Sequence, residues 1–446
     1  MSKKNVVVSI IGGGAAGLAS CYFAARQLKA LNIPGVNIRI LERKSETGKK
    51  ILMSGGSRCN VLPKVVDIKK DYFSEDMNIC RRILNSWNVP DCHKWLSSEI
   101  GLQLALEEGS NKYFPESNSA RDVRDLLLQR CQQLGVEVQY DRCVNNIVAD
   151  TSEDDFGGFT ITGTTDKDTQ QHFKLRSDIV VLASGGLSFP AVGTDGRGYG
   201  IASRLGHTVH PTYAALTPLT GTHPGGINDL RGVSLNVELK CGNAVSNRSG
   251  MVFTHKGFSG PSVLDLSHHI VQPLTLAQQQ SQQLVVPKLI VSFDGETRDV
   301  WARRLANETT EYGGQNMMVA NRIGQFLPSR LVDALLAELG VSGTTKICEL
   351  KQADRKALVE SLAAYQLQCS GHEGYRKAEV TGGGVSLRDI DHRTLESKTV
   401  PGLFIAGELL DVFGRIGGFN FYWAWTTGRA AGQGVAERIK HGRPTQ

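Results

Sequence analysis

The sequence lacks the features that would indicate a secreted, membrane-spanning or nucleic-acid-binding protein. Its nine cysteines are scattered, odd in number and without a CxxC pair, so we expect neither a disulfide framework nor a zinc site. No apolar run is long enough to cross a bilayer. No dense Lys/Arg block occurs, and the net charge is only +6 over 446 residues. These absences predict a reduced, cytoplasmic protein with no membrane anchor and no nucleic-acid partner.

A metal site is not expected either. His207 and His210 have a spacing that could suit metal ligands, but no carboxylate or thiol lies at a useful distance along the chain. The remaining composition, 40% apolar and 21% charged, is ordinary for a globular protein. The length is too great for one hydrophobic core, so two or three domains are predicted.

The first 43 residues carry the most informative pattern. Gly12-x-Gly14-x-x-Gly17 follows a short β-branched run at residues 6–11, which reads as a buried parallel strand. Gly12 permits a tight turn, Gly14 lets a pyrophosphate approach the backbone, and Gly17 lets the following helix pack against the sheet. The apolar run after Lys3-Lys4 resembles a signal peptide, but these glycines explain it better as a strand.

A helix at residues 15–31 and a second strand at 36–41 complete this pattern. The helix directs its N-terminal amides at the phosphates, and Glu42 ends the second strand. An acidic residue at that position accepts hydrogen bonds from ribose hydroxyls and disfavours a 2′-phosphate. A glycine-rich turn in an unrelated α/β protein would not explain Glu42. The order of these features therefore predicts a dinucleotide-binding βαβ unit.

The rest of the chain indicates a discontinuous nucleotide-binding domain with an insert. A strong strand at 179–183 ends in Ser184-Gly185-Gly186, and strand-like sequence returns near the C-terminus. We expect residues 1–208 and 372–446 to form the nucleotide domain and residues 209–371 to form the insert. Within the insert, 209–297 is β-rich. Residues 298–371 are predicted to be helical, with helices at 298–306, 317–327, 328–339 and 350–365.

The C-terminal block is a strand, a glycine turn, an acidic residue and a helix that begins with glycines. The free amides and positive dipole end of such a helix suit a flavin ring, which gains negative charge on reduction. An ordinary terminal βα unit explains this block equally well when it is taken alone. Its pairing with the N-terminal glycine motif favours the functional interpretation.

At the level of whole motifs, the chain resembles the HI0933-like (YhiN-like) flavoproteins. That group is also labelled BaiN-type or aminoacetone-oxidase-type NAD(P)/FAD-dependent oxidoreductases. The resemblance is carried by GGGAAGLAS, KKILMSGGSRCN, LASGGLSFPAVGTDGRGYGIASRLGH, FTHKGFSGPSVL, TGGGV and TLESKTVPGLFIAGELLDVFGRIGGFNFYWAWTTGRAAG. It spans nearly the whole chain. It implies an α/β fold with a Rossmann-like FAD-binding domain and an inserted part that is β-barrel-like and helical.

The resemblance also implies which residues contact FAD. Those at the pyrophosphate and ribose would be Gly12, Gly14, Ala15, Ala16, Gly17, Glu42 and Arg43. Those lining the flavin after the second strand would be Lys50, Ser54, Gly55, Arg58, Cys59 and Asn60. Ala183, Ser184 and Gly185 would lie near the adenosine or pyrophosphate. The ribityl chain and ring would be held by Gly407, Glu408, Asp411, Gly417, Gly418, Phe419 and Asn420. Ser184 stands where threonine is more usual, and Arg415 precedes the glycine pair.

The expected chemistry is hydride transfer between flavin N5 and a small-molecule substrate. NAD(P)H is a possible transient donor, since the sequence carries no second dinucleotide motif of good quality. Arg58, His255, Tyr422 and Arg415 are the polar candidates for facing the flavin, whereas Cys59 is expected to pack. Three alternatives remain open: an amine oxidase that uses oxygen, a flavoprotein acting on RNA, and a flavin-binding module for a protein partner. The substrate, the catalytic acid or base and the oligomeric state are not predicted.

Overall fold

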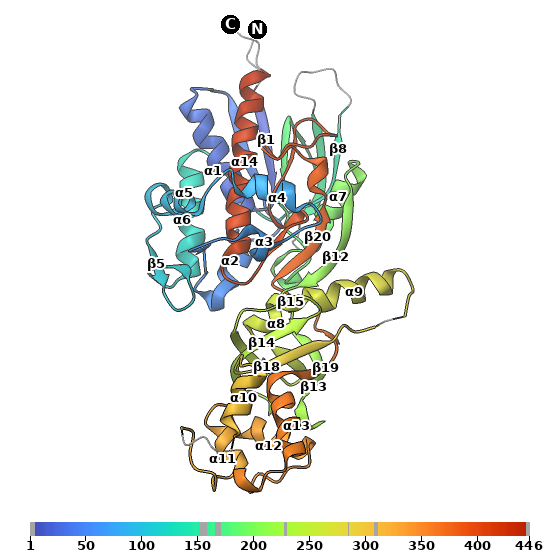
Figure 1. Cartoon of the computed structure of the whole chain (residues 1–446). Helices are drawn as coiled ribbons and strands as arrows, with labels where there is room; N and C mark the ends of the chain where they lie inside the picture. The colour runs from blue at the N-terminus through green and yellow to red at the C-terminus, as the bar shows by residue number, and fades with distance from the viewer. Residues whose placement is uncertain are drawn as a thin grey trace. The chain divides into compact units, whose positions relative to one another are not determined.

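The structure, a computed structural model, describes residues 5–150, 158–165, 171–226, 230–283, 285–306 and 311–442. The chain divides into two compact units, which are described separately. Unit 1 consists of Met1–Thr212 and Val380–Gln446, and unit 2 is Tyr213–Glu379. The sequence-based boundaries of the insert lie a few residues earlier at both crossings. Figure 1 shows how the elements follow one another along the chain.

Unit 1 is built on a five-stranded parallel sheet. In spatial order its strands are β21 (Leu403–Ile405), β11 (Ile179–Leu182), β1 (Val6–Ile11), β2 (Val36–Leu41) and β7 (Glu137–Gln139). β1 is in register with β11 from Val8↔Ile179 to Ile11↔Leu182. All four residues of β11 are buried, as expected for the β-branched interior of a parallel sheet covered on both faces.

The strand order reverses on either side of β1. The chain leaves β1 for β2 and β7, then returns to β11 and β21 on the opposite side. At such a switch point the loops at the carboxyl ends of the two neighbouring strands diverge and leave a crevice, where α/β proteins bind their ligands. The fold thus places the ligand edge of unit 1 at the segments that follow β1, β2, β11 and β21.

Two helices far apart in the sequence pack closely over this sheet. They are α1 (Ala15–Ala30) and α14 (Phe419–His441), which run side by side in Figure 1. Gly428 and Gly432 of α14 face α1: a Cβ on Gly428 would lie 2.6 Å from Ala19 Cβ, and one on Gly432 would lie 2.4 Å from the Ser20 carbonyl oxygen. Small residues on both helices therefore permit the close approach.

The other elements of unit 1 surround the sheet. The helices are α2 (Lys49–Met53), α3 (Ile68–Asp71), α4 (Met77–Leu84), α5 (Val89–Lys94), α6 (Ala120–Gln133) and α7 (Arg197–Arg204). A short 3-10 turn, η8, covers Gly407–Leu409. The additional strands are β3 (Leu62–Pro63), β4 (Tyr72–Phe73), β5 (Leu104–Glu107), β6 (Lys112–Pro115), β8 (Arg142–Ala149), β9 (Phe159–Thr165), β10 (His172–Ser177), β12 (Val209–Ala215), β20 (Val380–Val385) and β22 (Phe413–Gly414). β12 continues to the first residues of unit 2.

Two small antiparallel assemblies also belong to unit 1. β5 pairs with β6 in a hairpin from Leu104↔Pro115 to Glu107↔Lys112. β9 pairs with both β8 and β10. Residues 151–157 and 166–170 lie outside the described residues.

Unit 2 combines a closed antiparallel barrel with short helices. The barrel strands are β13 (Leu219–Thr222), β14 (Ser234–Cys241), β16 (Ser249–Phe253), β17 (Gly257–Ser259), β18 (Leu289–Phe293) and β19 (Tyr365–His372), with β15 (Ala244–Val245) beside β14. The barrel closes because β18 pairs with both β14 and β19. Alternate residues such as Val237 and Leu239 point inward and are fully buried.

The helices of unit 2 are α8 (Pro261–Leu266), α9 (His268–Gln279), α10 (Arg298–Arg304), α11 (Val319–Gly324), α12 (Ser329–Glu338) and α13 (Gln352–Ala363). The last four correspond to the helices expected from sequence. α8 and α9 lie within the part that was expected to be β-rich.

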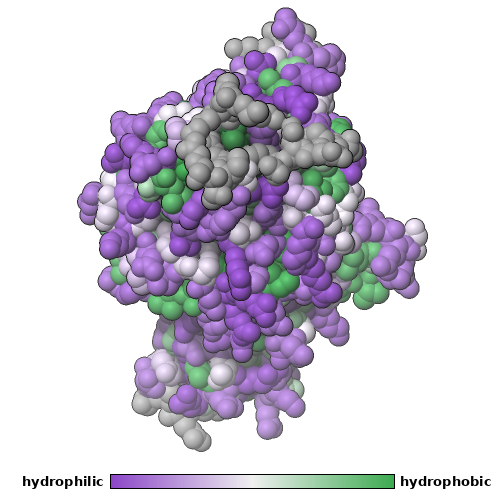
Figure 2. All heavy atoms as spheres, turned by 90° about the horizontal axis from the view of Figure 1, so that it is seen from above, coloured by the Kyte–Doolittle hydropathy of each residue, from purple (hydrophilic) through white to green (hydrophobic). Residues whose placement is uncertain are grey.

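No helix among the described residues is both long and apolar enough to cross a membrane. The face drawn in Figure 2 carries mostly hydrophilic side chains, with apolar groups in small separate patches.

Candidate cofactor site

The segments after the parallel strands meet at one edge of unit 1. A Cβ on Gly12 would lie 2.6 Å from the Ala183 carbonyl oxygen, so the turns after β1 and β11 are in contact. One on Gly407, after β21, would lie 2.7 Å from Ala16 Cβ at the start of α1. The structure therefore brings together most of the segments that the glycine motifs single out.

The glycine turn after β1 has the geometry that a pyrophosphate requires. Gly12 has φ +100°, which L side chains rarely adopt, and a Cβ on Gly17 would lie 1.9 Å from the Gly12 carbonyl oxygen. Gly14 differs, because a Cβ there would meet no atom of the described residues within 4 Å. No described side chain caps the N-terminus of α1 at Gly14. Open space at Gly14, beside helix amides that no described side chain caps, fits a phosphate group.

Glu42 closes the other side of this turn. Its Oε2 accepts the Gly13 amide at 2.8 Å and its Oε1 accepts the Lys44 amide at 2.8 Å. Burial raises the pKa of Glu42, while the hydrogen bonds from these two amides lower it. Each oxygen keeps a lone pair for a ribose hydroxyl. The neighbouring Arg43 pairs instead with Asp195, beyond the β11 turn.

The loop after α2 is shaped by left-handed backbone conformations. Gly55, Gly56, Ser57 and Cys59 all have positive φ. Non-glycine residues rarely adopt such angles, and clusters of them are typical of ligand-binding loops. Ser54 donates its hydroxyl to the Ile51 carbonyl at 2.7 Å. The loop is therefore held in one conformation by local contacts.

The same loop contacts the start of α14. A Cβ on Gly418 would lie 3.0 Å from the Asn60 carbonyl oxygen, and one on Gly417 would lie 2.7 Å from Lys112 Cε. The Asn420 side chain accepts the Gly414 amide and donates to the Gly414 carbonyl. The Phe419 carbonyl accepts the Tyr72 hydroxyl at 2.8 Å. These contacts fix the glycine-started helix end next to the loop at 54–60.

A charged cluster lies between the turns after β11 and β21. Lys50 Nζ is 2.5 Å from Glu408 Oε2 and 2.5 Å from Ser188 Oγ. Glu408 Oε1 accepts the Ser188 hydroxyl at 2.7 Å and the Thr381 amide at 3.0 Å. Lys50 and Glu408 were predicted from the sequence, whereas Ser188 and Thr381 were not. Both occur inside the quoted motifs LASGGLSFP and TGGGV, yet nothing in the sequence indicated that they meet.

Ser184 and Asp411 make other contacts. The buried Ser184 Oγ has no hydrogen-bond partner among the described residues, and a Cβ on Gly198 of α7 would lie 2.1 Å from it. Asp411 is 5% exposed. Its carboxylate accepts the Glu75 amide at 3.0 Å. Neither side chain hydrogen-bonds to Lys50 or Glu408.

Burial raises the pKa of Asp411 to about 6; the Glu75 amide and His210 lower it, and the carboxylates of Glu75 and Asp76 raise it. In the unfolded chain the value is about 3.9. Between these values only the folded state keeps the proton, so stability falls as pH rises through this window.

We therefore expect Asp411→Asn to raise the free energy of unfolding by about 2 to 3 kcal/mol at pH 7.5, with little effect near pH 4. Thermal or urea unfolding at both pH values measures this. The asparagine oxygen can still accept the Glu75 amide. An equal change in stability at both pH values would contradict the expectation.

The polar candidates for catalysis are dispersed. The Tyr422 hydroxyl is buried and donates to the Trp87 carbonyl, and burial raises the pKa of Tyr422. Arg58 donates to Asn118 and Glu107 and covers the Phe114 ring at 4.1 Å. These contacts favour packing for Tyr422 and an exposed, anchored position for Arg58.

Three further residues complete the set. Cys59 is fully buried, and burial raises its pKa to about 12, so it stays a thiol near neutral pH. Arg415 donates its amide to the Asp71 carbonyl, and its guanidinium lies 3.9 Å from the Asp71 carboxylate. His255 is exposed in unit 2, in the turn between β16 and β17.

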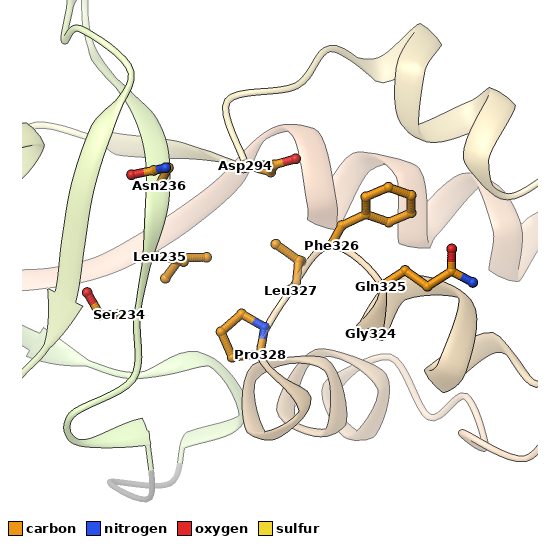
Figure 3. Close-up of a pocket in the computed structure, with 9 residues that line it drawn as sticks. All are labelled: Ser234, Leu235, Asn236, Asp294, Gly324, Gln325, Phe326, Leu327 and Pro328. Atoms are coloured by element: carbon orange, nitrogen blue, oxygen red, sulfur yellow. The ribbon is translucent and has the colours of Figure 1, made fainter. Parts of the chain in front are cut away.

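Elsewhere in the described part of the chain, neither the histidines nor the cavity of unit 2 forms a comparable site. No group of three or more His, Cys, Asp or Glu residues there could hold a metal ion. Both ring nitrogens of His207 contact oxygens, those of Ala202 and Ser397. A cavity of about 370 Å³ in unit 2, drawn in Figure 3, is lined by Ser234, Leu235, Asn236, Asp294 and residues 324–328. Its one carboxylate already pairs with Arg248 and Arg304.

The sheet order, the glycine turn and the two helix ends define a Rossmann-type dinucleotide-binding protein. Residues 6–434 match the model of the HI0933-like protein Rossmann domain, and the chain belongs to this family. It is an enzyme of a Rossmann-like, FAD-binding oxidoreductase family, as the sequence motifs had implied.

Two relatives align with almost the whole chain. "Ribosomal RNA dihydrouridine synthase" of Escherichia coli is 32% identical, over 95% of this chain and 96% of that protein. "3-dehydro-bile acid delta(4,6)-reductase" of Clostridium scindens is 30% identical, over 97% and 99%. Among solved structures, the open form of a flavocytochrome c3 fumarate reductase has a TM-score of 0.49 at 14% identity, covering 98% of this chain and 79% of that one.

Proposed function

We propose that this protein binds FAD at the carboxyl edge of the unit 1 sheet and reduces a carbon–carbon double bond conjugated to a carbonyl group. The observation that carries the reaction class is the pair of relatives. Dihydrouridine is uridine with hydrogen added across one ring double bond, and a delta(4,6)-reductase likewise saturates double bonds. The two names differ in substrate but share the reaction.

Several contacts support the position proposed for the cofactor. The open space at Gly14 and the free amides of α1 suit the pyrophosphate, with Gly12, Ala15, Ala16 and Gly17 forming the turn. Glu42 retains acceptor capacity for the ribose hydroxyls. Loop 54–60 and the Gly417–Gly418 end of α14 are in contact, and we assign them to the flavin ring. Ala183, Gly185, Gly407 and Glu408 would line the section between the two ends.

The bound cofactor supplies hydride transfer from its ring. For the proposed reaction, the hydride goes to the carbon β to the carbonyl, and a proton from solvent or a side chain goes to the α carbon. The developing negative charge rests on the carbonyl oxygen, where a donor lowers the barrier. NAD(P)H is the electron donor that we propose for the preceding reduction.

A uracil ring in ribosomal RNA is the first substrate that we propose, because the E. coli relative carries that activity in its name. A small cyclic enone is the second, because the bile-acid reductase aligns over an equal share of the chain. The net charge of +6 is compatible with either substrate. This first substrate departs from the sequence-based expectation that the protein has no nucleic-acid partner.

The test is an anaerobic titration of the FAD-loaded protein with NADH and NADPH, followed by one of the two substrates. We expect the flavin absorption to bleach with one nicotinamide. It should recover on addition of ribosomal RNA from cells that lack this enzyme, with a mass increase of about two hydrogens on a uridine. Recovery with a cyclic enone alone would identify a small-molecule reductase. A flavin that neither nicotinamide reduces, but an amine does, would refute the proposal.

A further inference from the structure

The Lys50–Glu408 pair at the cofactor edge is held by hydrogen bonds to both of its members. Lys50 reaches two acceptors, and Glu408 accepts bonds at both of its oxygens. The partners Ser188 and Thr381 are fully buried, whereas the side chains of Lys50 and Glu408 are 29% and 18% exposed. Buried partners therefore hold both charges in place, while the two charged side chains remain partly exposed at the cofactor edge.

The backbone turn after β11 leaves room for the Lys50–Glu408 pair. Thr381 Oγ1 accepts the amides of Leu187 and Ser188 at 2.7 and 3.2 Å, which fixes the turn after β11. A Cβ on Gly186 would lie 2.8 Å from Glu408 Oε1 and 2.4 Å from Thr381 Oγ1. A side chain at Gly186 would thus displace the carboxylate. The pair depends on glycine at this position.

Glu408 also lies between the two helices that delimit the cofactor site. The preceding residue, Gly407, touches Ala16 at the phosphate end of α1. The Gly407 amide donates to Thr427 Oγ1 at 3.1 Å, and the Gly407 carbonyl accepts the Trp423 indole N–H at 3.1 Å. Both of those residues are on α14. A charge carried by η8 is therefore located between the pyrophosphate end and the flavin end of the site.

We propose that Lys50 and Glu408 act on the bound flavin as two opposed fixed charges that set its reduction potential. This inference rests on the proposed FAD site but on no particular substrate. Reduction adds negative charge to the flavin, so a nearby cation favours the reduced form and a nearby anion favours the oxidised form. In a partly buried site such charges are weakly screened.

Other ionisable groups near the edge are less suited to this role. Cys59 is a buried thiol with a raised pKa, and the Tyr422 hydroxyl is bonded to a backbone carbonyl. Arg58 is 43% exposed and pairs with the equally exposed Glu107. Lys50 and Glu408 act on the flavin alone in this proposal, because no contact with the substrate is assigned to them.

The experiment measures the flavin reduction potential by equilibration with a reference dye. It uses FAD-loaded wild-type protein, Lys50→Gln, Glu408→Gln and the double variant. We expect Lys50→Gln to shift the reduced-to-oxidised ratio at least about tenfold toward oxidised flavin, which is about 30 mV for a two-electron couple. Glu408→Gln should shift it in the opposite direction. The double variant should lie near the wild-type value.

Controls separate this effect from loss of structure. Lys49→Gln removes a neighbouring positive charge that pairs with the more exposed Glu46, and it should shift the ratio by less than a third as much. Lys50→Arg should retain the wild-type potential. If Lys50→Gln does not fold, Lys50→Met gives a second neutral variant of similar length.

A structural role alone predicts that both single variants lower thermal stability and FAD affinity while leaving the potential unchanged or moving it in one direction. That result would overturn the inference. Wild-type protein that binds no FAD would overturn both this inference and the proposed function. A loaded flavin without the opposed shifts would overturn only the inference.

Discussion

Gly14→Ala is expected to leave the fold of the apoprotein intact and to lower its affinity for FAD by at least about a hundredfold, or about 3 kcal/mol. The reason is that a Cβ at this position meets no described atom within 4 Å and that φ is −80°, which alanine adopts readily. The added methyl group would occupy the space that the proposed pyrophosphate needs. The cost to the helix N-terminus should not exceed about 1 kcal/mol.

Gly17→Ala is the informative contrast, three residues along the same turn. Its Cβ would lie 1.9 Å from the Gly12 carbonyl oxygen, so α1 must move away from the sheet. We expect the free energy of unfolding to fall by about 2 to 4 kcal/mol. FAD binding should be weakened in the same variant. Gly109→Ala is the control, because a Cβ there also meets nothing and the position is in the β5–β6 turn. It should change neither property.

Thermal unfolding of the apoproteins and titration with FAD, followed by quenching of flavin fluorescence, measure both properties for each variant. Gly14→Ala protein that binds FAD as tightly as wild type would place the pyrophosphate elsewhere. Gly14→Ala protein that fails to fold would show that the fold does not accommodate a methyl group at this residue. The two glycines would then have one role instead of two.

The parts that could be predicted from sequence depend on short-range patterns. The spacing of Gly12, Gly14 and Gly17, with Glu42 at the end of the next strand, determines a βαβ unit within some forty residues of chain. The four helices after residue 298 were found for the same reason, because amphipathic periodicity is local. The family resemblance added the order of motifs over most of the chain.

The parts that were missed depend on long-range contacts. β5 has few residues and is a strand only because it pairs with β6, so propensity could not distinguish it from the helices before it. Barrel closure through β14 and β18 pairs strands about fifty residues apart. Ser188 and Thr381 are separated by nearly two hundred residues and meet only because β20 returns to unit 1. Single-sequence patterns contain no information about such pairings.

Gly432→Ala in α14 should lower the stability of unit 1 by about 2 to 4 kcal/mol, against the usual effect of this substitution. In an exposed helix, glycine to alanine stabilises by about 1 kcal/mol, because alanine has the higher helix propensity. Here a Cβ would lie 2.4 Å from the Ser20 carbonyl oxygen and 2.8 Å from the Ala24 amide nitrogen. These are backbone atoms of α1 and cannot rotate away, so the two helices must separate.

Separation of α1 and α14 would also affect the cofactor site, because each helix begins there. We therefore expect weaker FAD binding in Gly432→Ala, although residue 432 is several turns from the N-terminus of α14. Gly324→Ala at the end of α11 is the matched control: a Cβ there meets no described atom within 4 Å, so the variant should be as stable as wild type or slightly more so. Urea unfolding of the three proteins gives the sign of each change. A stabilised Gly432→Ala protein would mean that α1 and α14 are not in close contact, and the argument that one helix pair positions both ends of the cofactor would fail with it.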